Sequence, residues 1–261
     1  MSILSWYHYL NEDLADPRTK DWILVNSPSI LFVLTFSYLY FVLQCGPRYM
    51  EKKKAYSLKT VIKIYNVFQI VANALIIKEI FDAGWYEDYF FYCAPIDLTM
   101  NPTSMKICRI MWYLLILKLI DYVETGIFVL RKKQRQVSFL HLYHHVSTVI
   151  IAWLCVKYNV NGMTMTIPVV NCGIHVIMYS YYLAATFGPT VQRYLNKIKP
   201  LITIMQMIQF IVLMLYVAQA FIPGCSDLKF LPGIMLVNLM INFYLFYQFY
   251  QEAYVKKNKR S

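Results

Sequence analysis

The sequence predicts an all-α integral membrane protein with seven transmembrane helices. Hydrophobic residues make up 59% of the 261 residues and charged residues 15%, and the mean hydropathy is +0.44. A soluble domain carries about 25% charged residues, so this composition points to lipid as the solvent. Long apolar segments alternate with short basic clusters, which is typical of membrane proteins rather than of basic, water-soluble nucleic-acid binders.

Seven segments are long and apolar enough to be spans. A bilayer core of about 30 Å needs about 20 mostly apolar residues in each helix. Turn-forming Gly and Pro residues stand at their predicted ends, including Gly46-Pro47, Gly188-Pro189 and Pro200. The first segment is short and could begin upstream at Trp22. We predict spans at residues 30–43, 61–81, 110–130, 137–156, 163–187, 201–222 and 231–254.

The distribution of charge predicts the orientation of the chain. Lys and Arg cluster at residues 48–59, 131–135, 193–199 and 256–260, whereas most acids fall in the other loops. The positive-inside rule therefore places the N-terminus in the lumen and the C-terminus in the cytosol, in agreement with an odd number of spans. We treat residues 1–261 as a single transmembrane domain with a lumenal N-terminus (1–29), in which no cleavable signal peptide is predicted, and a basic cytosolic tail (255–261).

Two further features fit a membrane of the endoplasmic reticulum. Cys93 and Cys225 both fall in predicted lumenal loops, where a disulfide persists, and we predict that they pair. The alternative is two free thiols. The tail carries Lys257 and Lys259 at a dilysine spacing like that of a retrieval signal, although a basic tail can also simply contact lipid phosphates.

Polar side chains inside the predicted spans are the candidates for function, because ionisable groups are costly in a bilayer. Four consecutive spans each carry one polar stripe, and all four lie about 6–20 Å from the cytosolic ends at about 1.5 Å per residue. His8, outside the spans, is expected at the surface. The stripes are Lys118, Asp121, Glu124 and Thr125; His141, His144 and His145; Asn171, His175, Tyr179 and Tyr182; and Gln206 and Gln209.

Four interpretations of this polar layer are open. The stripes could be hydrogen bonds between helices only. An iron-dependent desaturase or hydroxylase would use histidines spaced like His141, His144 and His145, but a di-iron site needs more ligands than this layer offers. A proton-coupled transporter would need polar groups at the midplane and helices broken by Gly or Pro. Acyl transfer with an imidazole as nucleophile or base fits the layer best.

Four ordered blocks of residues resemble the ELO family of very-long-chain fatty acid elongases. One departure is that the two acids of the first block, Asp121 and Glu124, are exchanged relative to the common family pattern. The blocks cover about residues 112–210. They are Lys118-Leu-Ile-Asp121-Tyr-Val-Glu124-Thr125, Gln136-Val-Ser-Phe-Leu-His141-Leu-Tyr-His144-His145, Asn171-Cys-Gly-Ile-His175-Val-Ile-Met178-Tyr179-Ser-Tyr181-Tyr182, and Thr203-Ile-Met-Gln206-Met-Ile-Gln209.

The resemblance implies a 3-ketoacyl-CoA synthase of the endoplasmic reticulum. It would condense an acyl-CoA with malonyl-CoA and release CO₂ and CoA, with six helices forming a barrel-like bundle around a substrate tunnel and the seventh packed outside. No cofactor and no metal are expected. The expected partners are the bilayer, acyl-CoA and malonyl-CoA, other elongation-cycle enzymes and a second copy in a homodimer, but no nucleic acid.

We assign roles within this hypothesis. His144 is the nucleophile that carries the acyl chain as an acyl-imidazole, as the resemblance also suggests, and His175 and Asn171 bind the thioester carbonyl or enolate oxygen. His141 and His145 orient groups or move protons, supported by Asp121, Glu124, Gln206, Gln209, Tyr179 and Tyr182. Lys118, Arg131 and Lys199 are candidates for the CoA phosphates, or alternatively cations that set the topology.

Overall fold

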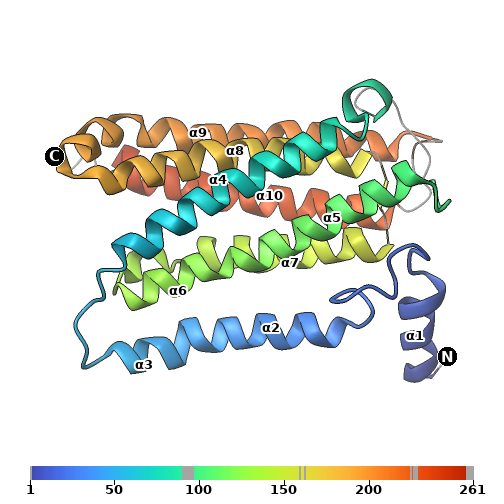
Figure 1. Ribbon diagram of the computed structural model, residues 1–261, viewed down its shortest axis with the longest axis horizontal. Helices are drawn as coiled ribbons and strands as arrows, with labels where there is room; N and C mark the ends of the chain where they lie inside the picture. Colours follow the sequence, from blue (N-terminus) through green and yellow to red (C-terminus); the bar gives the residue numbers. More distant parts are fainter. Residues whose placement is uncertain are drawn as a thin grey trace. The chain divides into compact units, whose positions relative to one another are not determined.

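The structure is a computed structural model that describes residues 2–89, 97–158, 160–161, 163–223, 225 and 229–256. This part of the chain is helical and contains no strand (Figure 1). Six of its helical segments are long and apolar enough to cross a membrane. The chain divides into two compact units: unit 1 is Met1–Ser57 with Asp82–Met165, and unit 2 is Leu58–Phe81 with Thr166–Ser261.

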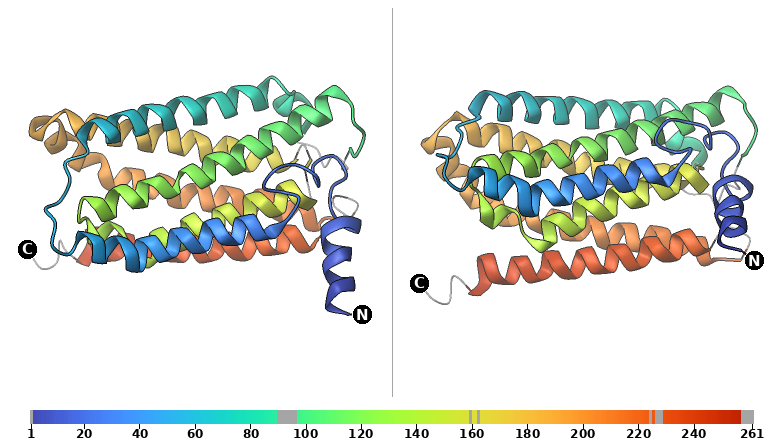
Figure 2. Two further views of the ribbon diagram at one scale, coloured as in Figure 1. Left: turned by 60° about the horizontal axis from the view of Figure 1, so that its bottom comes forward. Right: turned by 90° about the horizontal axis from the view of Figure 1, so that it is seen from below.

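Unit 1 contains α2, α5, α6 and α7, which run alongside one another, and the short α1, which crosses one end of this group (Figures 1 and 2). Its apolar core includes Tyr38 and Val42 of the first span and Val129 of α6. The helices are α1 (Ile3–His8), α2 (Pro28–Tyr40), α3 (Gly46–Met50), α5 (Pro102–Ile120), α6 (Tyr122–Leu130) and α7 (Phe139–Tyr158), with shorter turns at η1 (Tyr9–Asp13), η2 (Phe41–Cys45), η3 (Trp85–Tyr89), η4 (Gln134–Gln136) and η5 (Met163–Met165).

The first span is longer than predicted and extends downstream rather than toward Trp22. It continues from α2 through η2 and α3 as one candidate span, Pro28–Met50. Pro47 does not end the helix: it stands in the first turn of α3, directly after the π-helical turn η2. Local π-helical adjustments of this kind let a membrane helix continue past a proline. Gly46 is needed here, since a Cβ at this position would lie 2.7 Å from Val129 Cγ1.

The third predicted span is two helices rather than one. A turn at Asp121 separates α5 from α6, and α5 begins eight residues before the predicted segment. Neither helix is among the six candidate spans: α6 has only nine residues, and α5 carries Lys106, Arg109 and Lys118 within 19 residues. The prediction of a multi-span helical membrane protein is confirmed for six spans.

Unit 2 is a series of long helices in which α4 packs on α8, α8 on α9 and α9 on α10. Their bounds agree with the predicted spans except in α9, where Pro200 lies inside the helix and does not end it. The carbonyl that Pro200 leaves without its N–H belongs to the exposed Asn196, so water can bond it. The elements are α4 (Lys59–Phe81), α8 (Thr166–Ala184), η6 (Ala185–Phe187), α9 (Pro189–Ala218), η7 (Gln219–Phe221), α10 (Phe230–Tyr250) and η8 (Gln251–Val255).

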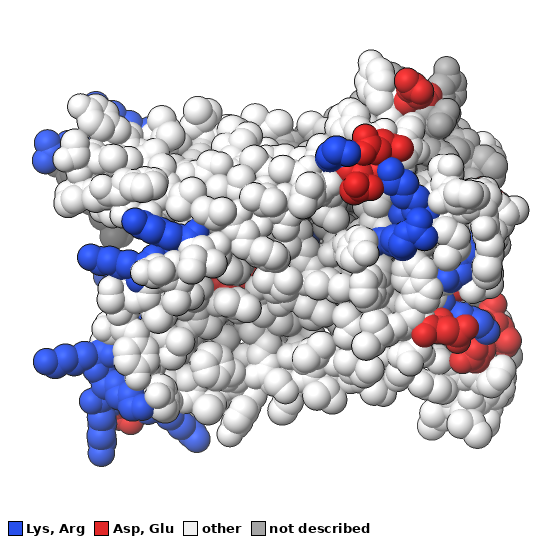
Figure 3. Space-filling view, in the orientation of Figure 1, with Lys and Arg blue, Asp and Glu red and all other residues white. Residues whose placement is uncertain are grey.

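Charged side chains of unit 1 gather at its two ends. Lys and Arg lie around α3 and the turn after α6, whereas Asp and Glu gather near α1, and the surface along α2 between them is uncharged (Figure 3). Lys52, Lys53, Lys54, Lys132 and Lys133 are all exposed. This separation is the one on which the predicted orientation rests.

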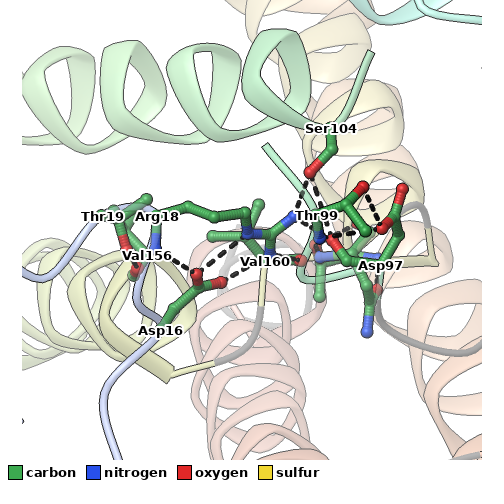
Figure 4. A network of polar contacts seen from close by, with 10 residues as sticks. Asp16, Arg18, Thr19, Asp97, Thr99, Ser104, Val156 and Val160 are labelled. Carbon is green, nitrogen blue, oxygen red and sulfur yellow. Dashed lines mark hydrogen bonds and ion pairs between the residues drawn. The ribbon is translucent and has the colours of Figure 1, made fainter. Parts of the chain in front are cut away.

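A buried arginine fixes the N-terminal segment to the rest of unit 1 (Figure 4). The Arg18 side chain is 2% exposed and donates to both carboxylate oxygens of Asp16, with Nε to Oδ1 at 2.9 Å. It also donates to Ser104 Oγ at 2.6 Å and to the carbonyls of Asp97 and Val160. Burial is the largest single effect and would lower the pKa of Arg18, but the hydrogen bonds to Asp16 together with the nearby charges of Asp16 and Asp97 raise the pKa above its usual value.

Two tryptophans extend this attachment along the membrane-facing helices. Trp112 of α5 donates from Nε1 to the carbonyl of Ile23 at 2.9 Å, and Trp153 of α7 donates to the carbonyl of Leu24 at 2.8 Å. The N-terminal segment is therefore held to the start and middle of α5 and to the second half of α7 before the first span begins.

Candidate active site

The three histidines of α7 form a cluster in unit 1, as their spacing predicted. The ring centroids of His141 and His145 are 4.1 Å apart, and those of His144 and His145 are 5.8 Å apart. His145 is buried, whereas His141 and His144 are half-buried. The Ser138 hydroxyl accepts a hydrogen bond from the backbone N–H of His141 at 3.2 Å, which caps the first turn of the helix that carries the cluster.

The two acids of the first block meet different partners. Glu124 Oε2 lies 3.8 Å from His145 Nε2, and both side chains are almost fully buried. Asp121 Oδ2 lies 3.5 Å from Lys118 Nζ, and these side chains are 4% and 5% exposed. Lys118 thus balances the charge of Asp121 inside unit 1, and its assignment to a CoA phosphate stays a prediction.

Thr125 connects His141 to a residue that the sequence analysis missed. Thr125 Oγ1 is 2.8 Å from His141 Nε2 and 3.0 Å from the hydroxyl of Tyr38, on the first span. The Tyr38 ring stacks on Tyr122 at a centroid distance of 3.9 Å, and the Tyr122 hydroxyl is 3.2 Å from Thr35 Oγ1. Tyr38 stands among apolar residues, so nothing in the local pattern marked it.

Three residues of this cluster could together hold a metal ion. One ligand atom each from Glu124, His141 and His145 lies within 4.8 Å of the others, and among the described residues no further group of this kind occurs. Two histidines and one carboxylate offer ligands for a single ion, not for a di-iron centre. The prediction that the protein uses no metal stays a prediction.

In unit 2, α8 places His175 in an aromatic environment. Its ring lies 5.7 Å from that of Tyr179, which contacts Tyr182 at 6.0 Å and Tyr65 of α4 at 5.9 Å. His175 and Tyr179 are buried, Asn171 one turn earlier is half-buried, and Tyr182 is 37% exposed. Tyr65 was not predicted as a site residue.

A buried row of amides on α4 is the second feature that the sequence analysis missed. Asn73 donates from Nδ2 to Gln69 Oε1 at 3.1 Å, and Gln69 donates from Nε2 to the Tyr65 hydroxyl at 2.8 Å. Asn66, Gln69 and Asn73 are at most 3% exposed. Their spacing of three and four residues within a span was a polar stripe like the four that we identified, and the same criterion would have found it.

The remaining predicted residues occupy separate places. Gln206 donates from Nε2 to Met178 Sδ at 3.4 Å, and Gln209 is buried on the same helix. Arg131 is half-buried at the end of α6, and Lys199 is exposed on α9. Cys225 is disulfide-bonded, whereas Cys93 lies outside the described residues, so the pairing of the two stays a prediction.

Comparison with known proteins identifies the family of this set of residues. The model of the ELO (GNS1/SUR4) family matches residues 23–261. The chain belongs to the ELO family. The mouse very long chain fatty acid elongase 1 is 33% identical over 257 residues, covering 98% of this chain and 91% of the mouse protein.

Relatives from other animals agree. The human very long chain fatty acid elongase 1 is 34% identical, covering 93% of this chain and 87% of its own length. A very long chain fatty acid elongase of Aedes aegypti is also 34% identical, covering 98% of this chain and 71% of its own. The ELO blocks that the sequence analysis identified on α5 to α9 are thus part of a similarity that spans nearly the whole chain.

Proposed function

We propose that the protein is a fatty acid elongase that condenses a long-chain acyl-CoA with malonyl-CoA to give a 3-ketoacyl-CoA, CO₂ and CoA. Membership of the ELO family supports this reaction, as do the names of its relatives. The observation that carries the chemistry is the cluster of His141, His144 and His145 against Glu124 in unit 1.

In the first half-reaction, an imidazole nitrogen of His144 attacks the acyl thioester. A C–N bond forms, the C–S bond breaks, and the CoA thiolate leaves and takes a proton from water. The acyl-imidazolium must lose its N–H proton to remain a stable carrier. His145, whose Nε2 faces the carboxylate of Glu124 at 3.8 Å, is the neighbouring base, and the pair accepts this proton.

In the second half-reaction, malonyl-CoA loses CO₂ to form an enolate. Its carbon attacks the acyl carbon on His144, a C–C bond forms, the C–N bond breaks, and the imidazole regains a proton from His145. His175 and Asn171 are proposed to bind the thioester carbonyl or enolate oxygen, where donors that meet developing negative charge are worth most. Tyr179 orients His175 through the ring contact.

The remaining predicted residues are proposed to bind CoA, in a reaction that needs no cofactor. Arg131, at the C-terminal end of α6, and Lys199, exposed in the first part of α9, are proposed to bind CoA phosphates. Lys118, buried beside Asp121, is proposed to reach a CoA phosphate when substrate binding exposes it. The helix pair α5–α6 is proposed as a further span, the third along the chain, which brings the total to seven. Six of the seven spans are proposed to form a barrel-like bundle around the acyl tunnel, with the seventh along the chain packed outside.

The setting of the enzyme is part of the same proposal. We place it in the endoplasmic reticulum membrane with its N-terminus in the lumen and its C-terminus in the cytosol, on the basis of the charge distribution. Other elongation-cycle enzymes and a second copy of the chain are its proposed protein partners.

The direct test is elongation by the purified, full-length protein in lipid nanodiscs. Radiolabelled malonyl-CoA is supplied with a panel of saturated and unsaturated acyl-CoAs, and the products are separated by chain length. The proposal expects a labelled 3-ketoacyl-CoA two carbons longer than at least one substrate, and loss of this product in His144→Ala. Release of labelled CO₂ without any lengthened product would contradict it.

A metal-dependent desaturase or hydroxylase is the second candidate, because Glu124, His141 and His145 approach one another closely enough to share an ion. Elemental analysis of the purified protein separates the two. Stoichiometric iron that is lost in His141→Ala and in Glu124→Gln would favour the second candidate. A metal content far below one ion per chain in a preparation that elongates acyl-CoA would dismiss it.

A further inference from the structure

The amide row of α4 includes one side chain that the helix itself does not use. Gln69 and Asn73 take part in the ladder that ends on the Tyr65 hydroxyl. Asn66 lies on the same buried stripe but is 3% exposed, and its Nδ2 meets no hydrogen-bond partner within the described part of the chain. A buried donor without a partner costs free energy, so a purely structural position would be occupied by an apolar residue instead.

The two ends of this buried stripe differ. The buried positions continue from Asn66, Gln69 and Asn73 to Ile76 and Ile80, so the amides lie within the first 15 of the 23 residues of α4 and the isoleucines follow them. Asn66 lies seven residues into α4, or about 10 Å at about 1.5 Å per residue. This is the depth at which the sequence places the other four polar stripes. The amides therefore form the polar part of α4, and the isoleucines its apolar part.

Asn66 lies close in the chain to residues that contact His175, because α4 packs on α8. α4 lies along α8, and Tyr65, adjacent to Asn66, contacts Tyr179, which in turn contacts His175. The face of α4 that carries the amides is thus neutral, and Asn66 Nδ2 is a donor on it that no described group accepts from. Neutral N–H donors in a buried site stabilise an oxygen atom on which negative charge develops.

The geometry points to Asn66 as a further substrate-binding residue, whose Nδ2 donates to a carbonyl oxygen of a CoA thioester or of the enolate formed from it. This deepens the proposed function and rests on it. The ladder of Asn73 and Gln69 holds the neighbouring Tyr65 in place, so it acts as a positioning element and not as a ligand. The ligand class is an acyl thioester, not a metal or an anion of the cytosol.

The decisive variant is Asn66→Leu, which has a similar volume and removes the donor. If Asn66 serves only the substrate, the midpoint of thermal unfolding stays within about 2 °C of wild type or rises, because an unpaired buried amide is lost. The elongation rate at saturating substrates falls by about 10- to 100-fold. Asn73→Leu is the contrast, since it breaks the ladder and lowers the midpoint. Val67→Leu, on the exposed face of the same turn, leaves both unchanged.

Two outcomes would overturn the inference. The first is Asn66→Leu with at least half of the wild-type elongation rate. The second is an Asn66→Leu midpoint lowered as far as that of Asn73→Leu, which would make Asn66 structural. If Asn66→Leu does not fold, Asn66→Asp decides, because it keeps the shape and removes both N–H donors: a wild-type rate in Asn66→Asp overturns the inference.

A binding measurement separates this inference from the proposed function. Stearoyl-CoA is added to the full-length protein without malonyl-CoA, and the rise of the unfolding midpoint is measured. Asn66→Leu is expected to lose most of the rise seen in wild type. An equal rise in both proteins overturns the role of Asn66 while wild-type elongation stands, whereas a wild type that binds stearoyl-CoA but never elongates it contradicts the proposed function alone.

Discussion

The polar interiors of the two units differ in kind. In unit 1 the buried groups are ionisable or bonded in pairs and chains: Lys118 with Asp121, His145 with Glu124, and Tyr38 through Thr125 to His141. In unit 2 they are mostly neutral amides and phenols around one imidazole, His175.

The buried groups that lack a hydrogen-bond partner also differ in kind between the two interiors. Within the described part of unit 2 they include the neutral amide atoms Asn66 Nδ2, Asn73 Oδ1 and Gln209 Oε1, whereas within the described part of unit 1 the group is the ammonium of Lys157, near the end of α7. Charged and paired groups suit a nucleophile and proton transfer, whereas unpaired neutral groups suit the binding of an uncharged carbonyl. The predicted nucleophile, His144, accordingly belongs to unit 1, and the predicted oxygen-binding groups, Asn171 and His175, belong to unit 2.

Replacing His144 or His175 with alanine is expected to have the largest effect and tests the difference between the two units most directly. His144→Ala is expected to reduce elongation by at least about 10³-fold and also to abolish CoA release from acyl-CoA alone, because no acyl-enzyme forms. His175→Ala is expected to reduce elongation by about 10²- to 10³-fold, as for a lost oxygen-binding donor, and to retain some CoA release. Both are measured by product formation and by thiol titration. If His175→Ala lost CoA release from acyl-CoA alone as completely as it loses elongation, the separate roles of the two units would be contradicted.

The Arg18 network tests whether unit 1 needs its N-terminal attachment for stability rather than for chemistry. Arg18→Met leaves Asp16 buried without its partner, and we expect a loss of about 3–5 kcal/mol in unfolding free energy. The activity per folded molecule should stay near wild type. Arg109→Met, exposed on α5, is the matched control. Denaturant unfolding in detergent checks the first expectation, and a selective loss of activity without a loss of stability would refute it.

Removing the charge of Glu124 tests whether proton transfer takes place in unit 1. Glu124→Gln keeps the shape beside His145 and is expected to lower the elongation rate by about 10- to 100-fold at unchanged KM for acyl-CoA, since a base in the proton transfer is weakened. Glu51→Gln, exposed beyond α3, is the control. A raised KM with an unchanged maximal rate would instead assign Glu124 to substrate binding.

The smallest expected effect is at Tyr38. Tyr38→Phe removes one hydroxyl from the chain to His141 and should lower the rate about 3- to 10-fold, with a loss of about 1 kcal/mol in stability. Because the chain orients the His141 ring, the rate–pH profile should also shift, which a loss of packing alone would not cause. Tyr40→Phe, exposed on the same helix, should change neither. An unshifted profile with a normal rate in Tyr38→Phe would remove Tyr38 from the site.

The sequence predicted most of the helices because hydropathy and charge report directly on lipid burial. It failed at Pro47 and Pro200, where a π turn and an exposed carbonyl let the helix continue. It also failed at Asp121, where a buried ion pair with Lys118 accompanies a turn that periodicity does not register.

In the candidate site, the histidines and acids were predictable because ionisable residues are rare in spans. Tyr38 was not predictable, because the chain has 23 tyrosines and nothing in the sequence distinguishes this one from the others. Only the structure shows its hydroxyl beside Thr125. Asn66, Gln69 and Asn73 were visible as a stripe at helical spacing, but they carry no charge and lie outside the four blocks that directed attention to α5 to α9.

The central claim is that His144 carries the acyl chain. The most direct measurement is the mass of the intact protein, followed by peptide mapping, after incubation with acyl-CoA in the absence of malonyl-CoA. The account predicts one acyl adduct per chain, located at His144 and discharged when malonyl-CoA is added. An active preparation that forms no adduct and releases CoA only when both substrates are present would contradict it, as would an adduct on Cys172 of unit 2.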